Sequence, residues 1–282
     1  MFNAMVVVSI VLLAAAGGFQ AYWGIGILGM FRGRRARAVP DAQLPKAAVI
    51  MTLRGADPFL DRTLQGLTQL DYPQYDVRIV VDHKEDPAWE LVHRIIRERG
   101  CRNVRVEELA ERRSTCSLRM SSLIQAVNGL DASYGVVAIV DADVVTYPGW
   151  LRDLVSPMAD PMIGATTGIR WFMPEGSNAG TLVRHVWNAA AVAQMRAFGI
   201  GWGGSLAVRT SLLRDGNILD KWSRIMFEDT FTANEVHSLR RRLQFVPEAT
   251  MINRESTDLS GCTKIICHGN WERRRCCPIM ST

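Results

Sequence analysis

The chain has 282 residues, of which 48% are hydrophobic, and it carries 33 basic and 28 acidic side chains for a net charge of +5. A charged fraction of 22% and a mean hydropathy near zero exclude a disordered chain and a multi-spanning membrane protein. Residues 32–46 carry +4 and residues 264–282 carry +3, which leaves −2 of the total for residues 47–263. Because the body is slightly acidic, nucleic acid is not expected as a partner.

The first 31 residues contain no charged side chain. Residues 5–30 form an apolar stretch that is longer than the about 20 helical residues needed to cross a hydrocarbon core. Residues 1–31 are therefore predicted to be a transmembrane anchor. A cluster of arginines opens the basic juxtamembrane linker, 32–46, and the positive-inside rule places everything after the anchor on the cytoplasmic side. A cleaved signal peptide is the alternative, but it normally has basic residues before a shorter apolar stretch.

Strand and helix patterns alternate in the first half of the body. Strands are predicted at residues 47–53, 77–81, 103–107 and 135–140, and helices are predicted to begin at Asp57-Pro58, Asp86-Pro87 and Ser117. Asp before Pro is typical of a helix start, because Asp caps the first turn and Pro has no N–H to satisfy. This alternation predicts an α/β fold in which helices cover both faces of a mainly parallel sheet.

Acidic residues follow two of these strands. Asp82 comes directly after 77–81, and Asp141-Ala142-Asp143 comes directly after 135–140. Sheets of this kind bind ligands at the carboxyl ends of their strands, so we expect these side chains to belong to one site. Two carboxylates one residue apart can hold one Mg²⁺ or Mn²⁺ that keeps positions open for phosphate oxygens. The alternative is a surface turn whose acids are solvated.

The second half of the body is predicted to contain strands at 163–170 and 206–208 and helices at 178–197 and 229–242. Gly203-Gly204-Ser205 precedes a strand, and it is either a turn that needs positive φ or a close approach of the backbone to a ligand. Glu228-Asp229 opens a helix. This pair either caps the helix N-terminus or supplies a general base that deprotonates an acceptor hydroxyl.

Five segments resemble, in their order and spacing, the motifs of family 2 inverting glycosyltransferases of the GT-A fold, and within them the ceramide glucosyltransferase branch. These segments are residues 53–58 with 70–77, 81–88, 141–143, 203–209 and 227–229. The branch usually has a Lys where Arg54 stands here. The resemblance implies a GT-A nucleotide-sugar transferase fold for residues 47–263, preceded by one transmembrane helix.

The resemblance also implies a chemistry. A hexose would pass from a nucleotide diphosphate sugar, UDP-linked, to the hydroxyl of a membrane lipid, with inversion and with a divalent Mg²⁺ or Mn²⁺ ion as cofactor. The implied roles are nucleotide-sugar binding by Asp82, Arg54, Asp141 and Arg119, metal binding by Asp141 and Asp143, acceptor-side contacts by Gly203, Gly204 and Ser205, and catalysis by Asp229 as the base with Glu228 beside it.

The C-terminal end departs from the family pattern. The sequence lacks the Q-x-x-R-W or R-x-x-R-W motif expected past the helix that carries the base, and it lacks further hydrophobic helices. Residues 264–282 are instead basic and rich in Cys, so we expect a disordered tail that reflects a truncated or frameshifted end. Two alternatives stay open: a catalytically impaired, membrane-tethered nucleotide-sugar-binding protein, and a polysaccharide synthase of family 2, which would need several spanning helices.

Overall fold

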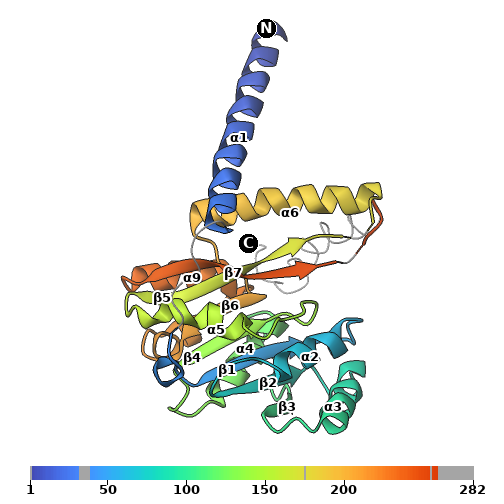
Figure 1. The fold of residues 1–282 in the computed structure, drawn as a ribbon, viewed down its shortest axis with the longest axis vertical. Coiled ribbons are helices and arrows are strands. Elements are labelled where there is room, and N and C mark those ends of the chain that lie inside the picture. The colour runs from blue at the N-terminus through green and yellow to red at the C-terminus, as the bar shows by residue number, and fades with distance from the viewer. Residues whose placement is uncertain (1, 32–38, 175, 255, 260–282) are drawn as a thin grey trace.

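The computed structural model describes residues 2–31, 39–174, 176–254 and 256–259. They contain a seven-stranded sheet in the order β3-β2-β1-β4-β6-β5-β7 (Figure 1). Its strands are β1 (Ala47–Leu53), β2 (Tyr75–Val81), β3 (Val104–Glu108), β4 (Val136–Val140), β5 (Ile163–Phe172), β6 (Ser205–Arg209) and β7 (Arg242–Asn253). Only β6 runs opposite to the others, because it pairs antiparallel with both β4 and β5. The predicted mainly parallel α/β sheet is confirmed.

Helices cover both faces of the sheet. They are α2 (Leu60–Thr68), α3 (Pro87–Arg99), α4 (Leu118–Asn128), α5 (Trp150–Val155), α7 (Thr210–Arg214), α8 (Ile218–Trp222) and α9 (Glu228–Ser238). The core has two layers, one beneath α2, α3 and α5 and the other beneath α4, α7, α8 and α9. Along β1, Val49 and Met51 enter the first layer while Ala48 and Ile50 enter the second. A strand buried on both faces in this way reads as a continuous apolar run.

Two helix starts follow the predicted chemistry. Asp86 caps α3 by accepting a 2.8 Å hydrogen bond from the Ala88 N–H, and Pro87 occupies the first position of the helix. Gly100 ends the same helix with φ +62°, in the left-handed region that favours glycine. Ser117 caps α4.

Two helix boundaries differ from the prediction. Helix α2 begins at Leu60, because Asp57 holds a separate turn in which its carboxylate accepts a 2.7 Å hydrogen bond from the Phe59 N–H. Helix α9 ends at Ser238 rather than at residue 242, since Arg240 takes φ +55° and the chain then enters β7, which was not predicted.

Two long helices lie outside these layers. Helix α1 (Phe2–Phe31) projects from the body, and α6 (Ala179–Phe198) lies across the C-terminal end of α1, between that end and the sheet (Figure 1). Residues 4–26 of α1 are long and apolar enough to cross a membrane, and no other helix of the described residues passes that test. The arginine cluster in residues 32–38 and the predicted tail, 264–282, lie outside the described residues.

Candidate active site

The carboxyl edge of the sheet brings the predicted site residues together. Asp82 follows β2 and Asp141 follows β4, and these strands flank β1 on its two sides. Strand β6 runs the other way and pairs Ser205 with Val140, so the two glycines before β6 lie beside the end of β4. The reversed strand therefore carries Gly203 and Gly204 to the same edge as the carboxylates.

A half-buried arginine joins two acidic motifs that lie far apart in sequence. Arg119, on the first turn of α4, places Nη1 2.9 Å from Asp141 Oδ1 and Nη2 2.7 Å from Glu228 Oε1. Its Nη2 also donates a 3.0 Å hydrogen bond to the Gly203 carbonyl oxygen. The Glu228 side chain is only 3% exposed, and this guanidinium is its partner in the protein interior. Three predicted motifs therefore meet at Arg119.

The helix-cap interpretation of Glu228-Asp229 holds only in part, because both acids lie in the first turn of α9 but neither occupies the N-cap position. The N-cap position of α9 is Phe227, and no side chain caps the helix there. Glu228 instead turns toward Arg119, while Asp229 Oδ1 accepts a 2.6 Å hydrogen bond from the Thr230 N–H. Burial raises the pKa of the Asp229 carboxyl above its ordinary value, and the neighbouring Glu228 charge adds to that shift. A carboxyl with a raised pKa accepts a proton more readily, as a general base must.

A second arginine, which sequence reasoning did not identify, neutralises the other carboxylate of the DxD triplet. Arg170, near the end of β5, forms an ion pair with Asp143, and its Nη2 lies 4.0 Å from Asp141 Oδ2. The guanidinium also lies over the rings of Phe172 and Trp202, 5.3 and 5.2 Å from their centroids. Burial raises the pKa of Asp143 even though Arg170 opposes that shift. The one sequence feature that could have indicated a role for Arg170 in the site is its position at the end of the predicted strand 163–170.

Hydrogen bonds fix the backbone of the DxD triplet. Thr63 Oγ1, on α2, donates a 2.8 Å hydrogen bond to the Ala142 carbonyl oxygen. Asn253, at the end of β7, donates from Nδ2 to the Asp143 carbonyl oxygen at 3.3 Å. Both Thr63 and Asn253 are buried, so Asp141 and Asp143 do not stand on a freely solvated surface turn.

A cavity of about 230 Å³ lies on the α4 side of this edge. It is lined by Arg54 and Arg119, by the hydroxyl-bearing residues Thr52, Ser117 and Ser122, by Arg112, and by Leu53, Leu118, Met226 and Phe227. Arg54 Nε also lies 3.7 Å from Asp82 Oδ2. Two of the residues predicted to bind the nucleotide sugar therefore line one cavity, and a third pairs with one of them.

A larger cavity of about 710 Å³ lies between α6 and the end of β5. Its charged lining consists of Asp57, Asp143, Arg170 and Arg184, and its aromatic residues are Phe59, Phe172, Trp187 and Trp202. Gly203, Gly204 and Ser205 do not line it, although the adjacent Trp202 does. Ser205 is buried and accepts a 2.9 Å hydrogen bond from Trp150 Nε1. The predicted acceptor-side segment thus adjoins this cavity only through Trp202, against which Gly204 packs.

Gly203 and Gly204 are required by close packing and not by their φ angles. The described glycines with positive φ are Gly55, Gly100 and Gly199, so the positive-φ interpretation of this turn is wrong. A Cβ on Gly203 would lie 2.1 Å from Glu228 Oε1, and one on Gly204 would lie 2.6 Å from Asp141 Oδ2. The close approach is therefore to side chains of the site itself: to Glu228 for Gly203, and for Gly204 to the Trp202 ring, 2.1 Å away, and to Asp141.

We expect Gly203→Ala to destabilise the protein by about 1–3 kcal/mol, the usual cost of overpacking, because the added methyl group displaces Glu228 from Arg119. Gly129→Ala is the matched control, since its Cβ meets nothing closer than 3.6 Å. That control should be neutral or stabilising by about 0.4–1 kcal/mol. Denaturant unfolding of the full chain in detergent measures both, and equal stability of the two variants would contradict the packing argument.

The donor set of the DxD triplet fits a divalent metal that completes its coordination elsewhere. Asp141 and Asp143 offer carboxylate oxygens from one strand end, and Mg²⁺ is usually held by one or two carboxylates together with substrate phosphates and waters. Among the described residues, no group of three or more His, Cys, Asp or Glu side chains could hold a metal ion by itself. A metal at this site would complete its coordination with oxygens of water or of a bound ligand.

Comparisons with known proteins agree with this geometry. Residues 8–276 match the sequence profile of a family described as Glycosyl transferase family 21. The mannosyltransferase PcManGT from Pyrobaculum calidifontis, in complex with GDP-Man and Mn²⁺, is 21% identical with a TM-score of 0.63 over 87% of this chain and 67% of its own. GalNAc-T7 with UDP, GalNAc and Mn²⁺ is 14% identical with a TM-score of 0.55 over 77% of this chain and 44% of its own.

Residues 1–349 of S. aureus TarS are 15% identical with a TM-score of 0.51, and the likeness covers 79% of this chain and 64% of that one. The chain thus spans about two thirds or less of the lengths of these three structures. At such identities the likeness shows the fold alone, and it confirms the predicted GT-A arrangement. The sequence motifs resembled family 2, whereas the profile that matches carries the number 21.

Proposed function

Because the chain belongs to glycosyl transferase family 21, we propose that it transfers a hexose from a nucleoside diphosphate sugar, UDP-linked, to the hydroxyl of a membrane lipid with inversion. The glycosyltransferase class follows from the family; the donor, the ceramide-like acceptor and the membrane location are the proposal. The observation that supports it most is Arg119, which joins Asp141 to the element that carries Asp229. This contact unites a diphosphate-side group and a base in one site.

On the donor side, Arg54, Asp82 and Arg119 would hold the nucleotide diphosphate around the smaller cavity. Asp141 and Asp143 would hold Mg²⁺ or Mn²⁺, and when bound that ion supplies charge neutralisation for the departing diphosphate. Structures of two similar proteins contain Mn²⁺ together with a nucleotide or nucleotide sugar, which supports this pattern. Arg119 pairs with Asp141 and Arg170 pairs with Asp143, so each carboxylate has its own arginine.

On the acceptor side, Asp229 would accept the proton of the lipid hydroxyl. The hydroxyl oxygen then bonds to the anomeric carbon on the face opposite the diphosphate, the bond to the diphosphate oxygen breaks, and the proton stays on the Asp229 carboxylate. Glu228 pairs with Arg119 and so acts as a positioning residue. The larger, aromatic-lined cavity would receive the head of the acceptor, with the segment Gly203, Gly204 and Ser205 adjoining it through Trp202.

We propose the same organisation along the chain as the sequence predicts: an anchor in residues 1–31, a basic linker in 32–46 and the transferase domain in 47–263, facing the cytoplasm. The apolar helix α1 supports the anchor. A single-pass arrangement would keep the site close to the membrane that contains its acceptor.

The acidic limb of kcat should reflect Asp229. Its carboxyl works as a base only when ionised, and its pKa is raised by burial, so kcat should fall as pH falls through a value above the ordinary Asp value of about 3.9. Because the pKa of Asp143 is also raised, donor and Mn²⁺ must be saturating at each pH. A kcat that stays constant down to about pH 4 would contradict this assignment.

The proposal is tested by release of nucleoside diphosphate from a panel of UDP- and GDP-sugars in the presence of ceramide and other lipid alcohols. We expect lipid-dependent release from a UDP-hexose. The second candidate, a binding protein without transfer activity, is favoured by the ion pairs that already occupy Asp141 and Asp143. Calorimetric donor binding with no release from any pair would support that candidate and contradict the transferase.

A further inference from the structure

Helix α6 departs from the ordinary pattern of a surface helix, whose exposed side is polar. Its exposed residues recur at helical spacing and are apolar, with Gln194 as the one polar side chain among them. We call this set the outer face of α6: Ala179, Leu182, Val183, Val186, Trp187, Gln194 and Phe198. Val186, Trp187 and Phe198 are 67%, 64% and 69% exposed. A contiguous apolar patch of this kind marks a surface that an apolar medium or a partner covers.

Two polar side chains of α6, Asn188 and His185, point into the protein instead. Asn188 accepts a 3.0 Å hydrogen bond from the Phe172 N–H and donates one of 3.0 Å to the Arg170 carbonyl oxygen. His185 Nδ1 lies 2.6 Å from the Phe172 carbonyl oxygen. These contacts tie α6 to the end of β5, and they fix which side of the helix faces outward. The exposure of the apolar face is therefore set by specific hydrogen bonds.

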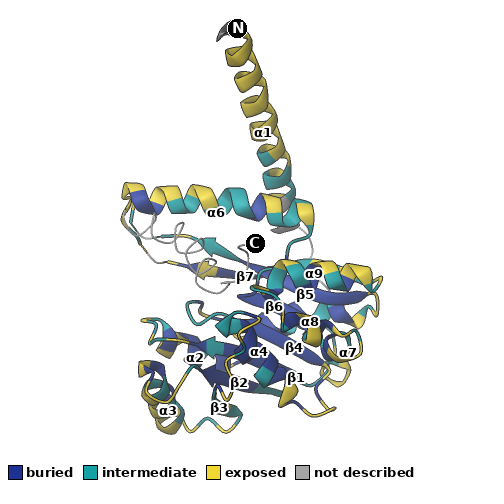
Figure 2. Cartoon of the chain, turned by 180° about the vertical axis from the view of Figure 1, so that it is seen from behind, coloured by how far each residue is buried: buried dark blue, intermediate teal, exposed yellow. Residues whose placement is uncertain are grey.

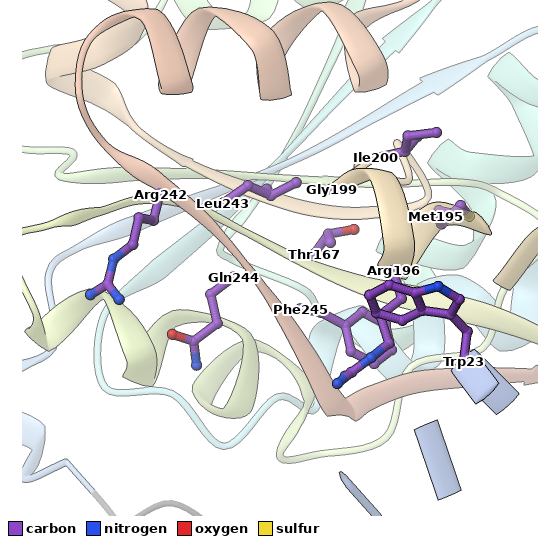
Figure 3. A pocket seen from close by; sticks show the side chains of 10 residues that line it. All are labelled: Trp23, Thr167, Met195, Arg196, Gly199, Ile200, Arg242, Leu243, Gln244 and Phe245. Atoms are coloured by element: carbon purple, nitrogen blue, oxygen red, sulfur yellow. The ribbon is translucent and has the colours of Figure 1, made fainter. Parts of the chain in front are cut away.

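The outer face of α6 continues into the apolar surface of α1. The ring of Phe198 stacks on that of Phe19 with centroids 6.2 Å apart. At the same junction the Arg196 guanidinium lies 5.8 Å from the Trp23 ring, and both side chains line the cavity of about 420 Å³ in Figure 3. Figure 2 shows the exposed length of α1 rising from α6 on the side away from the sheet. One medium that surrounds α1 would therefore meet the outer face of α6 as well.

We propose that α6 lies in the surface of the membrane that α1 crosses, with its outer face at the boundary between headgroups and acyl chains. Arg184 and Arg196 lie beyond the two edges of that face by helical spacing, with their guanidinium groups against the rings of Phe172 and Trp23, so no charged side chain stands within the outer face. A bilayer covers both helices at once, whereas a protein partner would have to enclose the base of α1 too. The occupant argued for is thus lipid.

The placement of α6 in the membrane surface has a consequence for acceptor entry, and that consequence rests on the proposed function. Trp187 belongs to the outer face of α6 and also lines the larger cavity, together with Arg184 and Asp143. A membrane surface along α6 would therefore put the mouth of that cavity at the depth of lipid headgroups. A lipid hydroxyl could reach Asp143 and its neighbours from the bilayer without leaving it.

The test uses the full chain in vesicles of phosphatidylcholine and phosphatidylglycerol, with the photoreactive residue benzoylphenylalanine in place of Val186 or, separately, Val183. The matched control carries it in place of Glu98, an exposed residue of α3. We expect at least about tenfold more lipid adduct from positions 186 and 183 than from position 98, since an in-plane helix contacts lipid directly. Adduct at the control level, or adduct to protein in place of lipid, would overturn the proposal.

The readout does not depend on sugar transfer. Lipid adducts from positions 183 and 186 in a chain that shows no transfer activity would support the placement of α6 and count against the proposed function alone. Two positions on one face guard against a local disturbance by either substitution, because both native residues are exposed and apolar.

Discussion

Asp229→Asn is expected to lower kcat by about 10²- to 10⁴-fold, the usual contribution of a general base, and to leave donor affinity nearly unchanged. The amide cannot accept the proton of the acceptor hydroxyl. It does retain an oxygen for the 2.6 Å hydrogen bond from the Thr230 N–H, so the start of α9 should persist. Steady-state rates and donor calorimetry on the same preparation separate the two effects.

The effect of the same variant on stability has a predictable direction. The folded-state pKa of Asp229 is raised, so the folded protein holds its proton more tightly than the unfolded chain does. Stability therefore decreases as pH rises from the unfolded pKa through the folded pKa, and the ionised carboxylate is unfavourable at neutral pH. Asp229→Asn removes that cost and should not lower the free energy of unfolding at neutral pH.

Glu235→Gln, on the same helix, is the control for the activity measurement, since Glu235 pairs with Lys221. Equal activity of the two variants would contradict the base assignment.

Asp141→Asn should abolish most metal-dependent donor binding. We expect kcat/KM to fall by about 10³-fold, which corresponds to several kcal/mol of lost charge stabilisation. Asp141 is the acid that lies against both arginines, 2.9 Å from Arg119 and 4.0 Å from Arg170, so its charge organises the site before any donor arrives. Calorimetric titration of a UDP-sugar with and without Mn²⁺ reports the loss directly.

Asp61→Asn is the control for this change. Asp61 lies on α2 and pairs with Arg99 at the surface, where an ion pair contributes little. Its donor affinity and Mn²⁺ dependence should match those of the unaltered protein. Full Mn²⁺ dependence retained in Asp141→Asn would sink the proposed metal role of Asp141.

The strand ends and their acids could be predicted from the sequence for a simple physical reason. Strands buried on both faces must be apolar throughout, so the first acid after the run marks the carboxyl edge. Asp82 and Asp141 follow β2 and β4 in this way, and both lie where predicted. Asp86 announces α3 equally well, because its cap is a local interaction.

Long-range contacts decided what the sequence could not predict. Glu228 reads as a helix cap because nothing nearby shows that Arg119, 109 residues away, will bind it. Strand β7 exists only through its pairing with β5, and the charged residues before it continue a helical pattern. Arg170 could not be predicted as a site residue, because its partner Asp143 follows a different strand and only the fold brings the two together.

The sequence of α6 predicts a helix but not that its apolar outer face is exposed. Apolar residues at helical spacing normally indicate the side that faces the core. Here the hydrogen bonds of Asn188 and His185 to the end of β5 leave apolar residues on the outer side as well.

The anomeric configuration of the product tests the account most directly. The full chain is incubated with a UDP-hexose of α configuration, Mn²⁺ and ceramide, and the lipid product is examined by NMR. With Asp229 as base and attack on the face opposite the diphosphate, the hexose must be β-linked to the lipid. An α-linked glycolipid, or free hexose as the sole product, would contradict the proposed inverting transfer.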